Sequence, residues 1–229
     1  MNPHYFQRDA FNNVTDAIKQ SPDDMRGRVV MPTGSGKTFT EALITDWQIK
    51  NNQKNGIHLV LAPRIMLGNQ LLKEFRKFLG KNAFRAIAFH SGEHKAEDGV
   101  KWKEQSTTRP SDVKEALSNA KILGQPLIVF STYHSCHKLN EIEFDTIIAD
   151  ESQYCVAENF NASFKSLQGR ARLSFTATEK TTASSNGFGL NNEELYGPRL
   201  YYIEPKELIA GGYIVPPRLH ILHGDALDE

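Results

Sequence analysis

Residues 31–38 read Met-Pro-Thr-Gly-Ser-Gly-Lys-Thr and stand between a short apolar run and a helical pattern. A strand, a glycine-rich turn and a helix in this order predict a phosphate-binding loop. Gly34 and Gly36 permit backbone conformations that point N–H groups into one cavity, and the helix after the turn directs its positive end at bound phosphate. The strict loop pattern begins with Gly, where Met31 stands. The alternative is a glycine-rich turn that binds nothing.

The chemistry of the loop residues favours ATP with Mg²⁺ as the ligand. Lys37 can pair with the β- and γ-phosphates, and the hydroxyl of Thr38 can coordinate Mg²⁺. The residues expected to contact ATP are Thr33, Gly34, Ser35, Gly36, Lys37 and Thr38.

The second half of such a site is an acid that follows a neighbouring buried strand. Residues 144–151 read Phe-Asp-Thr-Ile-Ile-Ala-Asp-Glu and place two acids after an apolar run. We predict that Asp150 serves Mg²⁺, through water, and that Glu151 acts as general base on the attacking water. An Asp-Glu pair after a strand can also simply mark the start of a helix.

Strand-like and helix-like runs alternate along the chain, which predicts an open α/β sheet, mostly parallel, with helices on both faces. The expected strands are 27–31, 57–62, 84–89, 127–130, 146–149 and 173–176. The expected helices are 4–20, 37–50, 64–79, 111–121 and 205–210, with Gly80 ending the third and Ser111 capping the fourth. Residues 91–109 are expected to form a loop.

The composition is that of an ordinary globular chain and excludes several classes of protein. Among 229 residues, 39% are hydrophobic and 24% charged. The sequence has neither a long apolar run for a membrane helix nor a secretory signal. The two cysteines, Cys136 and Cys155, are expected to be free thiols in a reducing cytoplasm.

The formal net charge of +0 does not by itself indicate a nucleic-acid partner. Any such contact must come from a local patch of basic residues. One candidate patch is Arg64, Lys73, Arg76, Lys77, Lys81 and Arg85. Its alternative interpretation is a solvated helix face.

Taken in order, the motifs resemble the first RecA-like lobe of a superfamily 2 helicase or translocase of the DEAD/DEAH-like group. The resemblance covers about residues 3–178 and is greatest to the branch with restriction-enzyme motor subunits and related DNA helicases. Phe-Gln-Arg-Asp-Ala at 6–10 is similar to the adenine-reading motif, so the resemblance adds Gln7 to the ATP contacts. It also makes Glu151, Lys37 and Gln153 the catalytic group.

Further motifs resemble the nucleic-acid contacts of that group. They are Pro63-Arg64 with residues 65–70, His90-Ser91-Gly92, and residues 131–135. The resemblance therefore implies backbone-phosphate contacts, which position a strand without reading its sequence. The implied nucleic-acid contacts are Arg64, Ser91, Gly92, Ser131 and Thr132.

Asp150-Glu151-Ser152-Gln153 resembles motif II of the group, whose fourth residue is usually His or Asp. Gln153 can still hydrogen-bond to Thr176-Ala-Thr178, which resembles motif III, so that Thr176 and Thr178 couple the nucleotide site to the nucleic-acid surface. Glu179 stands where many relatives have Pro.

The resemblance further implies a lobe at 1–180 and, at 181–229, a mobile loop and a linker toward a second RecA-like lobe in the same or a partner chain. That lobe carries an arginine finger, which contributes roughly 10³–10⁵ in rate. We therefore expect this chain, as a fragment, to hydrolyse ATP slowly and not to unwind a duplex alone. The expected partner is nucleic acid, DNA favoured over RNA, with no membrane. The alternatives are an ATPase that acts on a protein client and a degenerate binding-only lobe.

Overall fold

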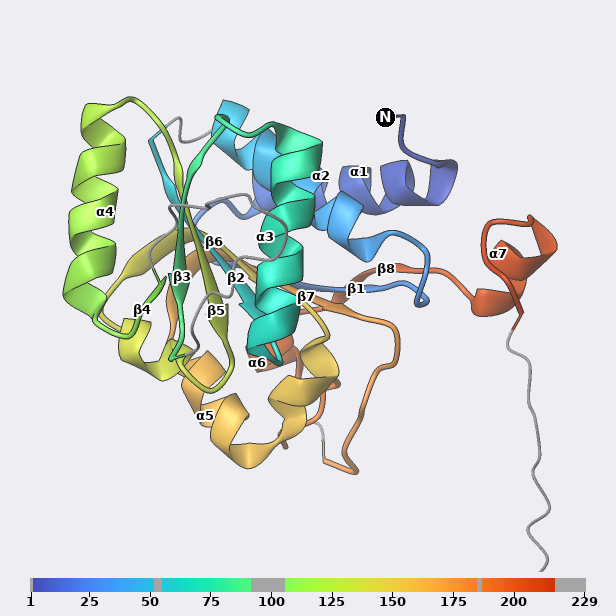
Figure 1. The fold of residues 1–229 in the computed structure, drawn as a ribbon. Helices are drawn as coiled ribbons and strands as arrows, with labels where there is room; N and C mark the ends of the chain where they lie inside the picture. Colours follow the sequence, from blue (N-terminus) through green and yellow to red (C-terminus); the bar gives the residue numbers. More distant parts are fainter. Residues whose placement is uncertain (1, 52–54, 92–105, 185–186, 217–229) are drawn as a thin grey trace, which may run out of the picture.

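A single parallel sheet organises the chain. The structure is a computed structural model and describes residues 2–51, 55–91, 106–184 and 187–216. In those residues eight strands follow the order β4-β3-β5-β2-β6-β7-β1-β8, and every neighbouring pair is parallel (Figure 1). The predicted α/β class is confirmed, and these pairings are parallel throughout rather than mostly so.

The central strands are the apolar runs of the sequence, because a parallel sheet buries its strands on both faces. The strands are β1 (Met25–Val30), β2 (Ile57–Ala62), β3 (Arg85–Phe89), β4 (Ser106–Thr107), β5 (Leu127–Thr132), β6 (Glu143–Ala149), β7 (Gln168–Thr176) and β8 (Arg199–Tyr202). The prediction for β2 is confirmed residue for residue, whereas β5, β6 and β7 extend past their apolar cores. The two edge strands, β4 and β8, were not predicted.

The helices lie close to their predicted ranges. They are α1 (Tyr5–Gln20), α2 (Lys37–Asn51), α3 (Ile65–Leu79), α4 (Pro110–Ile122), α5 (Glu158–Lys165), α6 (Glu193–Tyr196) and α7 (Pro205–Ala210), with 3₁₀ turns η1 (Cys136–Leu139) and η2 (Ser152–Val156). Gly80 ends α3 with a φ of 104°, as predicted. The prediction that Ser111 caps α4 is wrong, because Pro110 already occupies the first turn and Arg109 is the capping position.

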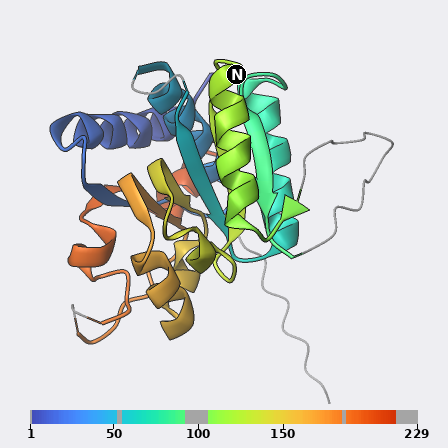
Figure 2. The ribbon, with the colours of Figure 1, turned by 90° about the vertical axis from the view of Figure 1, so that its left-hand side faces the viewer.

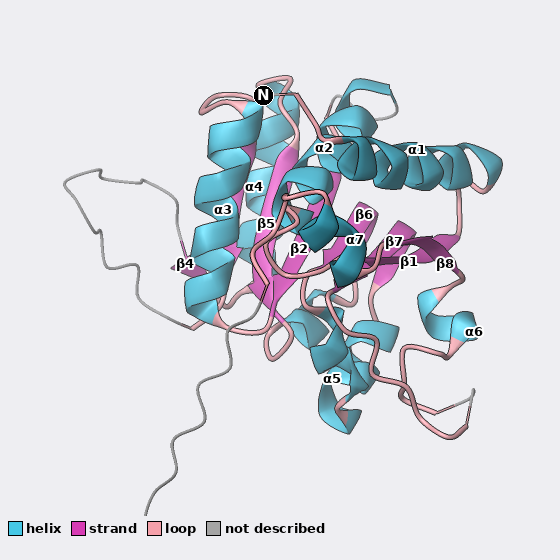
Figure 3. Cartoon of the chain, turned by 90° about the vertical axis from the view of Figure 1, so that its right-hand side faces the viewer, coloured by secondary structure: helices cyan, strands magenta, loops and turns pink. Residues whose placement is uncertain are grey.

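Two apolar cores cover the two faces of the sheet. The first contains buried residues of α1, α2, α3 and α7, and the second contains those of α4, α5 and α6. Figure 2 looks onto the β4 end, with α4 in front. Figure 3 shows α1 and α2 on the opposite side of the sheet from α5 and α6. Cys136 and Cys155 are buried free thiols in the second core, as expected.

The segment after β7 packs onto the same body in its described part. β8 pairs with β1, and Leu208 of α7 is buried in the first core. The division into a lobe ending at 180 and a linker beyond it stays a prediction. Within the described ranges, no helix is long and apolar enough to cross a membrane.

Candidate active site

The glycine-rich loop at 31–38 joins β1 to α2 at the carboxyl edge of the sheet. Gly34 and Gly36 have φ angles of 83° and 82°, which disfavour residues with a Cβ. A Cβ on Gly36 would also lie 2.5 Å from Nε2 of Gln7. The Ser35 hydroxyl donates to the Pro32 carbonyl at 2.7 Å. The loop therefore has the conformation that the two glycines predict.

Gln7 of α1 ties the loop to the N-terminal helix. Its Nε2 donates to the Ser35 carbonyl at 2.8 Å, and its Oε1 accepts from the His4 backbone N–H at 2.9 Å. Both ends of the amide are thus engaged with protein. Each end of the amide can make a second hydrogen bond, and contact between Gln7 and adenine stays a prediction.

Lys37 is the one cation inside the site in the described part of the chain. Its side chain is 8% exposed, and its Nζ lies 3.7 Å from a Glu151 carboxylate oxygen and 3.5 Å from the Met31 carbonyl. The lysine therefore pairs with the acid that is predicted to act as base. Lys37 begins the helix after β1, and Glu151 follows β6. The sheet therefore brings together the two halves of the ATP site that the sequence predicts.

The acid pair follows β6, which is separated from β1 by the single strand β7. Tyr133 is fully buried and donates its hydroxyl to the Asp150 carbonyl at 2.6 Å. Glu151 has a φ of 51°, the single positive value among the described residues other than glycine, and its N–H donates to Oδ1 of Asp150 at 2.9 Å. Such strained backbone is concentrated at functional sites. The turn aims the two carboxylates in different directions from one strand end.

Glu41 is a third carboxylate of the site, and sequence reasoning missed it. It lies one helical turn after Lys37 on α2, is completely buried, and its two oxygens accept no hydrogen bond from any described residue. Its carboxyl contacts that of Asp150. A hydrogen bond between two carboxyls needs a proton on one of them. The spacing of four from Lys37 was the available signal, since it places both side chains on one helix face.

The charges at this edge fit a divalent cation. Burial and the charge of Glu151 raise the pKa of Asp150 to about 6, although the charge of Lys37 acts to lower it. Burial and Asp150 also raise the pKa of Glu41 well above its usual range. Three carboxyls thus face one lysine. The described residues include no cluster of three metal-ligating side chains, which is compatible with Mg²⁺ because that ion takes few protein ligands and relies on phosphate and water.

A chain of hydrogen bonds connects the acid pair to the end of β7. Gln153 donates to the Glu151 carboxylate at 2.7 Å and accepts from the Thr176 hydroxyl at 2.6 Å. The Thr178 N–H donates to the same hydroxyl at 3.0 Å. The bond from Gln153 to Thr176 is therefore present, although Gln replaces the usual His or Asp.

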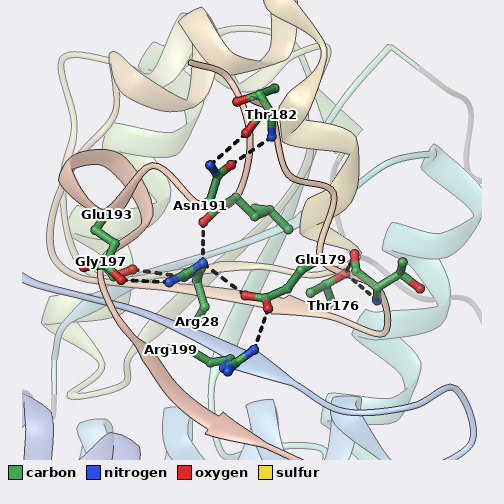
Figure 4. Close-up of polar contacts among 10 residues, drawn as sticks. Arg28, Thr176, Glu179, Thr182, Asn191, Glu193, Gly197 and Arg199 are labelled. Carbon is green, nitrogen blue, oxygen red and sulfur yellow. Dashed lines mark hydrogen bonds and ion pairs between the residues drawn. The ribbon is translucent and has the colours of Figure 1, made fainter. Parts of the chain in front are cut away.

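Glu179, which follows Thr178, belongs to an ionic network around Arg28 of β1 (Figure 4). Arg28 is 8% exposed and lies 3.1 Å from Glu179 and 3.2 Å from Glu193, while Arg199 of β8 lies 2.9 Å from the other oxygen of Glu179. Arg28 also donates to the carbonyls of Leu190 and Gly197. This network fixes the segment after Thr178 against β1.

The residues predicted to contact nucleic acid do not form one cluster as the residues of the predicted ATP site do. Arg64 and Ser91 are exposed, whereas the side chains of Ser131 and Thr132 are buried and bonded to the Phe89 carbonyl and to Ser135. Gly92 lies outside the described residues. The contacts of Ser131 and Thr132 stay predictions that require local rearrangement.

The predicted basic patch is only partly a solvated face. Arg76 is 8% exposed, donates to the Lys81 and Phe84 carbonyls, and stacks over the Phe84 ring. Lys77 pairs with Glu74 at 3.8 Å. Arg76 is therefore structural, and the patch gives little support to a nucleic-acid surface.

Comparison with protein families identifies the chain. The family described as "Type III restriction enzyme, res subunit" matches residues 1–181. The chain belongs to this family. No curated protein sequence matches the chain. The family match includes the loop at 31–38, the acid pair and Thr176, so all the residues of the predicted ATP site lie within it.

Solved structures of related architecture confirm the fold of the chain. A nuclease-deletion mutant of the Type ISP restriction-modification enzyme LlaGI, solved with a DNA substrate mimic, is 23% identical with a TM-score of 0.77, over 93% of this chain and 21% of that one. The Sulfolobus solfataricus SWI2/SNF2 ATPase core with dsDNA is 20% identical with a TM-score of 0.55, over 78% and 32%. The UvsW helicase of bacteriophage T4 is 15% identical with a TM-score of 0.56, over 88% and 61%. The chain spans about a fifth of the length of the LlaGI enzyme.

Proposed function

We propose that this chain is the ATP-hydrolysing first RecA-like lobe of a nucleic-acid helicase or translocase. The observation that carries the proposal is the meeting of Lys37, Asp150 and Glu151 at one sheet edge, with Gln153 bonded onward to Thr176. A lysine, a buried acid and a second, partly exposed acid after a glycine-rich loop are the parts that nucleotide hydrolysis requires.

Each residue has a definite task in this proposal. The loop N–H groups bind the phosphates, and Lys37 moves from Glu151 to the β- and γ-phosphates. That move frees Glu151 to orient a water and accept its proton. Thr38 and Asp150 would hold Mg²⁺, which would neutralise charge on the phosphates when bound. Gln153 transmits the change at Glu151 to Thr176 and Thr178.

We further propose that the client is nucleic acid, DNA favoured over RNA, and that a second RecA-like lobe completes the site. Support comes from family membership and from similar proteins whose structures contain DNA. The division into a lobe at 1–180 and a linker at 181–229 belongs to this proposal. An ATPase with a protein client is the alternative, since the basic patch around α3 is partly engaged in internal contacts.

Steady-state ATP hydrolysis tests the proposal, first without polymer and then with single-stranded DNA, duplex DNA and RNA in turn. Glu151→Gln should lower the rate by about 10²–10⁴ while ATP still binds, and the exposed Glu158→Gln serves as the matched control. Stimulation by one polymer that Glu151→Gln abolishes would support the motor. ATP turnover that no polymer changes, even with the second lobe supplied, would contradict it and favour a protein client.

A further inference from the structure

A second cavity lies on the face of the sheet that carries α5 and α6. Its volume is about 340 Å³, and its walls come from β1, β7, α5 and the segment 187–195. The lining residues that matter here are Arg26, Asn161, Lys165, Arg172, Phe188 and Asn192. This size is within the range of small-ligand sites, which is about 300–1,000 Å³. No step proposed for ATP hydrolysis uses this cavity.

Positive charge at the floor of the cavity is only partly compensated. Arg26 and Arg172 are register partners on the paired strands β1 and β7, and like charges side by side repel each other. Arg26 has an acidic partner, Asp24, at 3.1 Å. Arg172 and Lys165 form no ion pair with any described residue, and the buried Nε–H of Arg172 donates no hydrogen bond to any described residue. Glu194 is the acid among the lining residues.

Arg172 of this pair is partly buried, unlike an arginine on an open polar surface. Burial and the charge of Arg26 lower the pKa of Arg172 from its ordinary value. Two β-strands thus hold a partly desolvated guanidinium beside another cation. An oxyanion that enters the cavity would relieve this repulsion and would accept charge-assisted hydrogen bonds from the cationic side chains that line it.

The segment 187–195, which forms part of the cavity wall, is held in place by hydrogen bonds and an ion pair. Arg28 binds the Leu190 carbonyl and the Glu193 carboxylate (Figure 4). Asn192 caps α6 by accepting from the Leu195 N–H and donates to the Gly187 carbonyl. These bonds hold Phe188 at the rim, where its side chain is 44% exposed. An exposed aromatic ring beside cations is a platform on which a nucleobase can stack.

We propose that this cavity is a phosphate-binding site, separate from the glycine-rich loop, that takes a phosphate group on Arg172 and Lys165 with an attached base on Phe188. The phosphate is part of either a free nucleotide or a nucleic-acid strand. The site does not depend on ATP hydrolysis, and it stands whether or not the proposed motor function does.

Chemical protection of Lys165 tests the site in the folded chain. Acylation of lysines by an amine-reactive acetate ester is followed by mass spectrometry, with Lys37→Ala as background so that the glycine-rich loop cannot account for binding. Inorganic phosphate, thymidine monophosphate, thymidine and a short oligothymidylate are compared. Phosphate-bearing probes should slow the acylation of Lys165 several-fold and leave Lys121, an exposed lysine on α4, unchanged.

The probes distinguish the two sources of phosphate. Protection by thymidine monophosphate would assign a free nucleotide, and protection by the oligonucleotide alone, at equal phosphate concentration, would assign a strand. Protection by thymidine alone, equal protection of Lys121, or no protection by any probe would overturn the proposal.

Variants then test the roles of the individual residues. Arg172→Gln and Lys165→Gln should each weaken binding of the protecting probe roughly tenfold, whereas Lys121→Gln should not. Phe188→Ala should weaken the nucleotide or oligonucleotide and leave inorganic phosphate unaffected. Lys165 is exposed, so its variant should fold even where Arg172→Gln does not. Unchanged binding in Lys165→Gln and Phe188→Ala would contradict the site.

Discussion

Two buried charged clusters lie on and beside the same strand, β1, and differ in how completely they are satisfied. Around Arg28, two carboxylates and two carbonyls surround one guanidinium. Around Lys37, three carboxyls face one ammonium, and the oxygens of Glu41 accept no bond from the described residues. The first cluster is closed and structural. The second has more carboxyls than cations and keeps unbonded carboxyl oxygens, and we expect this incompleteness of a site that takes a cation.

Removing the centre of the closed cluster should have the largest effect on stability. Arg28→Met leaves the half-buried carboxylate of Glu179 and the carbonyls of Leu190 and Gly197 without their donor. We expect the free energy of unfolding, measured by urea denaturation, to fall by about 3–5 kcal/mol.

Arg199→Met is the matched control for this prediction. It removes the other, half-exposed arginine from the same Glu179, and the expected loss is about 1 kcal/mol or less. Equal losses in the two variants would show that the Arg28 cluster is no more than a surface ion pair.

A third buried polar group, at His58 and Thr146, shows that burial of polar atoms alone does not identify a functional site. His58 of β2 and Thr146 of β6 are register partners, both are buried, and their side-chain polar atoms have no partner among the described residues. Burial lowers the pKa of His58 from 6.5 to about 4. The folded chain therefore keeps this histidine neutral, without excess charge. An orphaned polar atom alone does not indicate a ligand site.

The lowered pKa of His58 predicts an acid-sensitive fold. Below about pH 6.5, His58 binds a proton in the unfolded chain but stays neutral in the folded chain. The free energy of unfolding therefore falls as the pH drops and levels off below about pH 4. The contribution is roughly 3 kcal/mol across that window. Urea denaturation of wild type and His58→Leu at several pH values measures it. Parallel stability curves for the two proteins would refute the assignment.

The incomplete cluster should be stabilised by replacing Glu41, whose carboxyl is costly to ionise because it is buried beside Asp150. Glu41→Gln replaces an acceptor that faces Asp150 with an amide that can donate to it. We expect the free energy of unfolding of the nucleotide-free chain to rise by about 1–2 kcal/mol near pH 7.

The pH dependence of that gain gives a second check. The folded pKa of Glu41 is raised, so the folded state binds more protons above the unfolded pKa, and the wild type loses stability as the pH rises through that interval. The gain in Glu41→Gln should therefore grow with pH and vanish in acid. If Glu41→Gln were less stable than wild type at every pH, the carboxyl of Glu41 would have its hydrogen bonds satisfied in the folded chain, which would contradict the account.

How much of this could be predicted follows from how local each signal is. The strand–turn–helix pattern around Gly34 and Gly36, and the acids after an apolar strand, are local, so the loop, the acid pair and the parallel class followed from the sequence. β8 and the Arg28 network join residues about 170 positions apart, and single-sequence patterns do not report such pairings. Ser131 and Thr132 were assigned from a motif that does not specify burial. Glu41 was missed because its spacing from Lys37 places it on the same helix face but does not report its burial or its contact with Asp150, which follows a distant strand.

Calorimetric titration of ATP with Mg²⁺ into wild type, Lys37→Ala and Lys50→Ala tests the central claim most directly. Lys50 lies on the same helix but is exposed and paired with Asp46. The account predicts that wild type and Lys50→Ala bind alike and that Lys37→Ala loses binding by roughly a hundredfold or more while its thermal unfolding stays cooperative. Unchanged nucleotide affinity in a folded Lys37→Ala protein would contradict the assignment of the site.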